Sequence, residues 1–143
     1  MGIFGNLFGS KKLRINDSDF GEIQSFSSRG NDVGWQINKR LFNSDIEILI
    51  AGDKSGIADT QKRILLNALN NETEIKAESE KALKEQFEKA EMEFVSIEKH
   101  FELKGISVRD EGFEMAFQEK EGQNYFFSVH FEKNKQVGVS IDG

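Results

Sequence analysis

The 143-residue chain contains no cysteine and no proline. Without Cys it has no disulfide, no thiolate metal site and no Cys nucleophile, a composition that fits a reducing compartment. Without Pro, no X–Pro bond can slow its folding. No run approaches the roughly 20 apolar residues of a membrane-spanning helix, and residues 1–8 lack the basic region of a secretory signal. We therefore expect a cytoplasmic protein.

The aromatic content is concentrated in one residue type, with thirteen Phe against one Trp and one Tyr. Phe carries no polar group, so these rings are expected to fill a core; the alternative is that they line a cavity for an apolar ligand. The length suits one domain with a single core. Charged residues make up 31% of the chain, with both signs interspersed, which indicates a folded, soluble domain.

The net charge of −6 arises largely between residues 72 and 102, which hold ten Glu and five Lys. An acidic surface gains nothing from counterion release on DNA, so we expect no nucleic-acid binding. Most of these charges are spaced as i, i+4 pairs of opposite sign, typical of a solvated helix face. The alternative is an acidic docking surface for a basic protein partner, with Glu78, Glu85 and Glu88 as its contact residues.

Residues 1–12 form a separate N-terminal segment. Four apolar residues there are spaced for one face of a short helix, and basic residues follow them. Three glycines make this helix marginal by itself. We expect a flexible segment or one that docks on its own domain; contact with an anionic membrane or with a partner groove are alternatives. Residues 13–143 are expected to form the single domain.

The hydrophobic periodicity divides that domain into three blocks. Residues 13–51 alternate like short strands joined by polar turns, and the clearest strand is 46–51. A helical block follows, with one helix from about Ile57 to Asn70 and a second that uses Thr73 as N-cap and ends near residue 91 or near residue 100. Alternation returns from 106 to 141.

This order predicts an α+β fold in which antiparallel strand blocks flank a central two-helix segment that packs on the sheet. The strands form one large sheet or two abutting ones. We expect the first strands and the last ones to pair or pack together, because neither block alone can bury its own faces and the helices.

No catalytic or metal-binding motif passes a spacing check. Gly52–Gly56 lies between a strand and a helix, but its Lys-Ser pair precedes the second Gly instead of following it as in a phosphate loop. Asp17 and Asp19 begin like a calcium loop that lacks its later ligands. His100 and His130 have no metal-ligand spacing. We expect no cofactor, no metal and no enzymatic activity; an enzyme would need carboxylates and His130 to converge in a cleft.

Three further residues are candidate contact residues. Trp35 and Tyr125 are anchors if exposed on a sheet, but for Trp35 core packing is the favoured interpretation and the contact role is the alternative. His130 lies on the strand face opposite Phe127 and Val129, which places it toward solvent or a groove of the sheet.

Short elements across most of the chain resemble a group of small, uncharacterised bacterial α+β domains, some of which are immunity proteins of polymorphic toxin systems. The residues that carry the likeness are Phe20-Gly21-Glu22, Trp35, Ile48, Ile50, Gln61 and the closing stretch Val137-x-Val139-Ser140-Ile141-Asp142-Gly143. The resemblance implies a bacterial origin and a binding role, and it transfers no site residue.

The sequence thus predicts a non-enzymatic protein-binding module, in its most specific form an immunity-type inhibitor. The alternative is a small protein that binds an apolar ligand in a Phe-lined cavity between sheet and helices. The expected partner is another protein, and the oligomeric state is left open.

Overall fold

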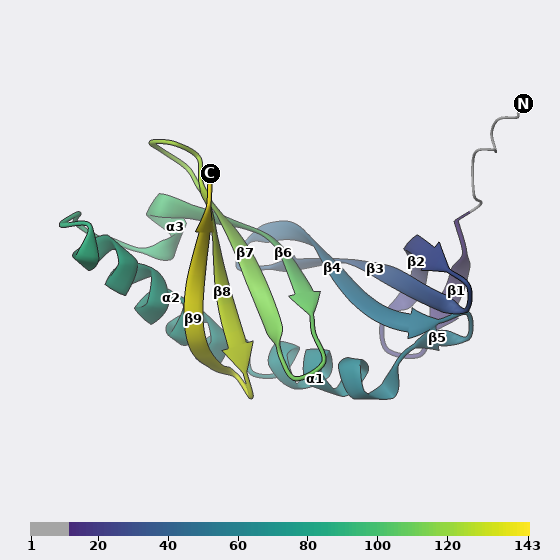
Figure 1. The fold of residues 1–143 in the computed structure, drawn as a ribbon. Coiled ribbons are helices and arrows are strands. Elements are labelled where there is room, and N and C mark those ends of the chain that lie inside the picture. The colour runs from purple at the N-terminus through teal and green to yellow at the C-terminus, as the bar shows by residue number, and fades with distance from the viewer. Residues whose placement is uncertain (1–11) are drawn as a thin grey trace, which may run out of the picture.

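The structure is a computed structural model that describes residues 12–143, so the predicted N-terminal segment lies outside the described residues except for Lys12. Within this part the chain forms a mixed α/β fold dominated by one mostly antiparallel sheet (Figure 1). Its elements in chain order are β1 (Arg14–Asp17), β2 (Gly21–Arg29), β3 (Asp32–Leu41), β4 (Ser44–Asp53), β5 (Gly56–Ile57), α1 (Asp59–Leu69), α2 (Glu72–Lys89), α3 (Ile97–His100), β6 (Phe101–Val108), β7 (Phe113–Glu119), β8 (Phe126–Glu132) and β9 (Lys135–Asp142).

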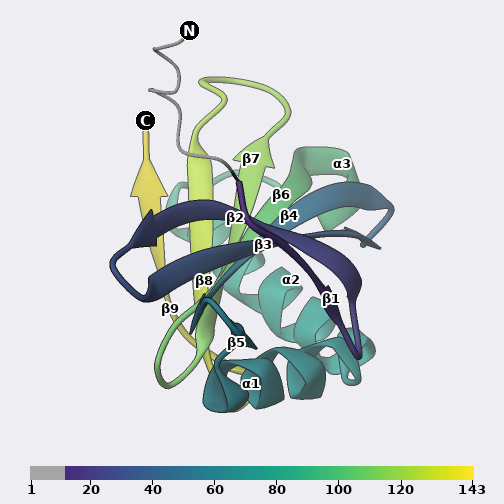
Figure 2. The same cartoon turned by 90° about the vertical axis from the view of Figure 1, so that its right-hand side faces the viewer.

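The two strand blocks are two antiparallel meanders that join in one sheet. The strand order is β1-β2-β3-β4-β6-β7-β8-β9, with the short β5 paired to β4. The blocks meet where β4 runs parallel to β6, with residues 47–49 opposite residues 105–107. The first and last strands therefore lie at opposite edges of the sheet, and the blocks pair through their inner strands. Figure 1 and Figure 2 show how strongly the strand direction turns between β3 and β9.

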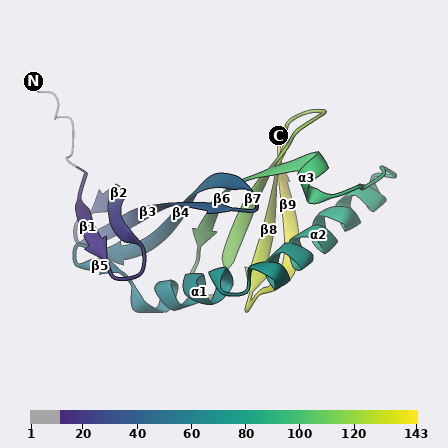
Figure 3. The ribbon, with the colours of Figure 1, turned by 180° about the vertical axis from the view of Figure 1, so that it is seen from behind.

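The helices cover one face of this sheet, as Figure 3 shows for α1 and α2. On the covered face every second strand residue is buried: Ile46, Ile48 and Ile50 on β4, Phe113, Met115 and Phe117 on β7, and Phe127, Val129 and Phe131 on β8. Burial of each such side chain contributes about 1.5–3 kcal/mol. From α2, Ile75, Ala82, Leu83 and Phe87 close the core. The alternation that predicted the strands is thus the pattern of a sheet with one buried face.

Aromatic rings pack against one another within this core. Phe101 lies 5.6 Å from Phe87, 6.2 Å from Phe117 and 5.0 Å from Phe127 between ring centroids, and Phe113 stacks on Phe131 at 4.7 Å. These distances are those of favourable aromatic pairs. They are packing contacts and give no support to the ligand-cavity alternative, which stays a prediction.

The start of each long helix differs slightly from the sequence prediction. α1 begins at Asp59 rather than Ile57, since Gly56 and Ile57 pair with the end of β4 as β5. Thr73 is not the N-cap of α2; that position is Asn71, and the helix begins at Glu72. The pairing of β5 and the short turn between the helices are tertiary features that local propensity does not encode.

The second helix ends near the earlier of the two predicted positions. α2 ends at Lys89, where Glu91 takes a left-handed φ of 58° and the Met92 N–H bonds back to the Phe87 carbonyl at 2.9 Å. Such a reversal closes the last turn of a helix. The apolar residues that continue this spacing belong to other elements: Phe94 precedes α3, Ile97 begins it, and Phe101 begins β6. The N-cap of α3, Ser96, accepts a hydrogen bond from the Lys99 N–H.

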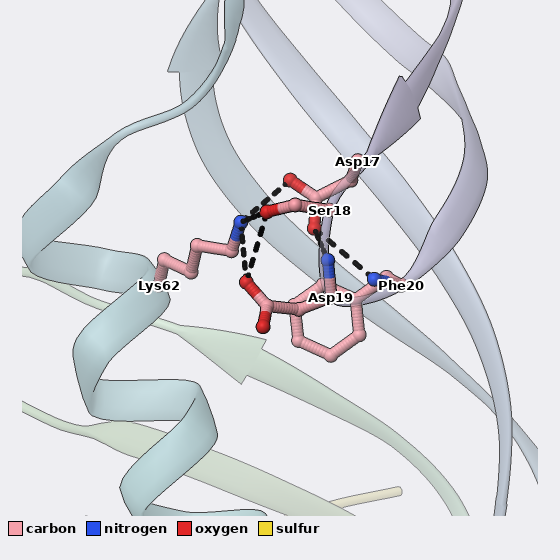
Figure 4. Close-up of polar contacts among 5 residues, drawn as sticks. All are labelled: Asp17, Ser18, Asp19, Phe20 and Lys62. Carbon is pink, nitrogen blue, oxygen red and sulfur yellow. Dashed lines mark hydrogen bonds and ion pairs between the residues drawn. The ribbon is translucent and has the colours of Figure 1, made fainter.

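An ion cluster fastens α1 to the turn between β1 and β2 (Figure 4). The Lys62 ammonium lies 2.9 Å from Asp17 Oδ1 and 2.7 Å from Asp19 Oδ2. The side chains of Lys62 and Asp17 are only 18% and 8% exposed. The other Asp17 oxygen accepts hydrogen bonds from the backbone N–H groups of Asp19 and Phe20. Asp17 and Asp19, whose spacing resembles the start of a calcium loop, thus bind the Lys62 ammonium of the same chain.

The cluster shifts the pKa values of both Asp17 and Lys62. Burial by itself would raise the pKa of Asp17, but the hydrogen bonds from Lys62 and from two backbone N–H groups outweigh it, so that this pKa lies below its ordinary value. Hydrogen bonds to Asp19 and Asp17 raise the pKa of Lys62 above its ordinary value. Both shifts mean that the charged pair is favoured by folding.

We predict that Lys62→Met lowers the free energy of unfolding by about 2 kcal/mol, because it removes charge-assisted hydrogen bonds and leaves two carboxylates facing each other. Urea unfolding measures this loss. Arg40→Met is the matched control, since its partner Asp45 and Arg40 itself are 87% and 63% exposed; its cost should stay within about 0.5 kcal/mol. Equal losses in the two variants would contradict a special role for the cluster.

The stabilisation should depend on pH at both ends of the range. The Asp17 pKa is depressed from 3.8, so its contribution is complete above about pH 5 and is lost as the pH falls through the lower native value. The Lys62 pKa is raised from 10.5, so its contribution is present below that value and is lost as the pH rises through the higher one. The difference in stability between wild type and Lys62→Met is expected to be largest between about pH 5 and 9. A difference that is constant from pH 2 to pH 7 would refute this linkage.

Candidate functional site: the uncovered face of the sheet

One face of the sheet carries no helix in the described part of the chain, and a groove crosses it over β2, β3, β4 and β6. The groove has a volume of about 750 Å³. Its floor and walls are mostly apolar at the centre and charged at the rim. The lining includes Phe26, Gly34, Leu49, Ala51, Ser107 and Arg109.

Phe26 forms one wall of the groove because of an irregularity in β2. The register between β2 and β3 shifts between Ser25 and Ser27, so Phe26 has no partner of its own in the ladder. Its ring lies over Gly34, where a Cβ atom would come within 2.6 Å of the ring. Glycine at position 34 therefore leaves the space that the ring occupies. Phe26 stays 46% exposed, unlike the buried Phe side chains of the core.

Arg109 links the groove to a row of polar side chains on the same face. It lines the groove at the end of β6, and its guanidinium lies 2.8 Å from Glu114 Oε1 on β7. The other Glu114 oxygen lies 3.2 Å from Nδ1 of His130 on β8. His130 Nε2 in turn lies 2.8 Å from the Ser140 hydroxyl on β9. Three consecutive strands and the residue that follows β6 thus contribute one side chain each.

The residues that the sequence singled out do not share one place. Trp35 packs in the core, as favoured, and is not a contact residue, because it is fully buried and its indole N–H donates to the Asp53 carbonyl at 3.0 Å. Tyr125 is 38% exposed just before β8. His130 lies on the uncovered face, as the strand alternation predicted.

The acidic residues of α2 are only partly available to a partner. Glu78 is half-buried and accepts a hydrogen bond from the Gln136 N–H on β9 at 3.1 Å. Glu85 and Glu88 are exposed, and Glu85 lies 4.0 Å from Lys89 within the same helix. Their role in an interface stays a prediction.

The two histidines have different surroundings. His100 accepts a hydrogen bond from the Val95 N–H, and its ring lies against Phe87 and Phe94. Among residues 12–143, no group of three or more His, Asp or Glu side chains is placed to hold a metal ion. None of the helices in this range is long and apolar enough to cross a membrane.

Sequence reasoning missed Phe26, Arg109, Glu114 and Ser140. Phe26 could be recognised only once the register shift in β2 was known. Arg109, Glu114 and Ser140 come together only through the pairing of β6 to β9, and the spacing of residues in the sequence does not predict that pairing.

No family model, curated protein or solved structure matches this chain. A functional assignment therefore rests on the geometry of the uncovered face.

We predict that Phe26 contributes little to stability. Phe26→Ser should lower the free energy of unfolding by about 1 kcal/mol, because nearly half of the side chain is already in water. Phe117→Ala, at a fully buried position, should cost about 3–5 kcal/mol. Urea unfolding of the two variants distinguishes them; similar costs would make Phe26 a core residue rather than a surface one.

Proposed function

We propose that this chain is a protein-binding module that uses the uncovered face of its sheet as the contact surface. The observation that carries the proposal is the half-exposed Phe26 beside an apolar groove, on a face where residues 12–143 place no helix. Aromatic anchors of this kind are enriched in the energetically dominant part of protein interfaces.

The groove has the composition of a contact surface. Leu49 and Ala51 supply its apolar floor, while Arg29, Asp32 and Arg109 stand at its margin. An apolar centre with a charged rim is how protein interfaces are commonly built. The rim carries both signs of charge, which favours a partner with mixed polar groups over a strongly basic one.

The sheet face is favoured over the acidic helix face for an electrostatic reason. Two carboxylates of α2 already serve the chain itself, since Glu78 binds the backbone of β9 and Glu74 lies 3.1 Å from the Lys135 ammonium. The negative charge left on α2 is exposed and screened within about 10 Å at ordinary salt. The immunity-type inhibitor is the most specific form of this proposal and rests on the sequence resemblance.

Affinity capture from a lysate of the source organism tests the proposal when variants of the chain are compared with the wild type. Capture by the wild type alone does not identify the contact surface. A partner held by the wild type should be lost from Phe26→Asp, with a fall in affinity of about 30-fold or more, because a charge replaces the anchor. It should remain bound to the double variant Glu85→Lys/Glu88→Lys, which changes α2 instead.

Salt provides a second readout. Binding through the apolar groove should persist from about 50 to about 500 mM NaCl, whereas binding through exposed carboxylates should weaken steeply. Loss of the partner from the helix variant but not from Phe26→Asp would refute the sheet face as the contact surface and assign binding to α2.

A further inference from the structure

Three adjacent strands place a hydroxyl, an imidazole and a carboxylate in one hydrogen-bonded chain on the uncovered face. Ser140 Oγ is 2.8 Å from His130 Nε2, and His130 Nδ1 is 3.2 Å from Glu114 Oε2. Glu114 stands directly opposite His130 in the β7–β8 ladder. This is the order of groups, nucleophile then base then orienting acid, that activates serine nucleophiles.

The chemistry of the groups fixes the direction of the hydrogen bonds. An ionised Glu114 can only accept, so it holds the proton of a neutral His130 on Nδ1. Nε2 then carries the lone pair, and the Ser140 hydroxyl donates to it. The second Glu114 oxygen accepts from Arg109 at 2.8 Å, which holds the carboxylate in place. The hydroxyl proton of Ser140 thus already points at its acceptor.

The hydroxyl is also reachable from solvent. Ser140 is exposed, and the His130 side chain is 38% exposed. Gly138, directly opposite His130 on β9, has open space where a Cβ atom would stand, with no atom within 4 Å. A small carbonyl group therefore has room beside both reacting atoms.

We propose that Ser140 is an activated nucleophile that takes an acyl group from an activated carboxylic ester. Ser140 Oγ forms a bond to the carbonyl carbon while its proton passes to His130 Nε2. The bond between that carbon and the leaving oxygen then breaks, and His130 gives its proton to the leaving oxygen, directly or through the solvent. Water later adds to the acyl carbon while neutral His130 accepts its proton; the bond from that carbon to Ser140 Oγ breaks, Oγ takes the proton back from His130, and the acid is released.

The expected rate of acylation follows from the catalytic groups that are present. A positioned general base is worth about 10²–10⁴-fold in rate. Stabilisation of the oxyanion supplies a comparable further factor in fast hydrolases. The base and its orienting acid account for the first factor alone, so the reaction expected here is a slow acylation that favours good leaving groups.

The acylation of Ser140 goes beyond the proposed binding function, and its reacting groups lie outside the groove; Arg109 is shared, because it lines the groove and also holds Glu114. Phe26 and the groove floor do not enter it, so the two proposals fail separately. They share the uncovered face, since Ser107 of the groove stands opposite Glu114 in the β6–β7 ladder.

The test uses the purified full chain and 4-nitrophenyl acetate. Release of 4-nitrophenolate is followed by absorbance, and peptide mass mapping locates the acetyl group. We expect one acetyl on Ser140, none there in Ser140→Ala, and acetylation of Ser140 slowed about 100-fold or more in His130→Gln. Glu114→Gln should slow it as well, and Glu114→Asp should restore part of the rate, because Glu114 acts by positioning His130.

Ser128 provides the matched control, because it is the serine directly opposite Ser140 on β8. Ser128→Ala should leave the rate unchanged, and circular dichroism with thermal melting confirms that each variant is folded. Acetyl groups found only on Lys or His side chains would overturn the proposal. So would acetylation of Ser140 that is as fast in His130→Gln as in the wild type, since the pair would then be a structural hydrogen bond only.

Discussion

The parallel pairing of β4 with β6 is the constraint on which the rest of the structure depends. Two adjacent parallel strands need a connection that runs from the C-terminal end of the first strand back to the N-terminal end of the second. Helices commonly form this connection. Here α1, α2 and α3 fill this path, and α1 and α2 lie on one face of the sheet. Within residues 12–143 no helix lies on the opposite face, and it is there that the groove and the Glu114–His130–Ser140 row lie.

α1 holds the two halves of the sheet together from the covered side. Lys62 binds the turn between β1 and β2, while the neighbouring Gln61, which is 8% exposed, donates from Nε2 to Asp110 in the turn between β6 and β7 at 3.1 Å. Consecutive residues of one helix thus contact turns on either side of the β4–β6 pair. Because both contacts are partly buried, each contributes more to the stability of the fold than an exposed pair such as Arg40–Asp45.

The strand blocks and the central helices could be predicted because their signal is local: alternation for Phe113, Met115 and Phe117, and helical spacing for Leu83 and Phe87. The site could not be predicted, because its geometry depends on register. A shift between Ser25 and Ser27 puts Phe26 on the groove. Another between His130 and Phe131 accompanies a pairing in which Gly138 lies opposite His130 and Ser140, two residues on, reaches the His130 ring. Such irregularities arise from the fit between strands, which no spacing in a single segment reports.

The short contact between β4 and β6 also bears on how the chain folds. Within each meander, neighbouring strands are joined by turns of a few residues, so the entropy lost in bringing them together is small. The β4–β6 contact spans three residue pairs and closes a loop that contains all three helices. The topological cost of folding is thus concentrated at one junction between two locally connected halves. The same junction completes the continuous face on which Leu49 of the first half and Glu114 of the second stand together.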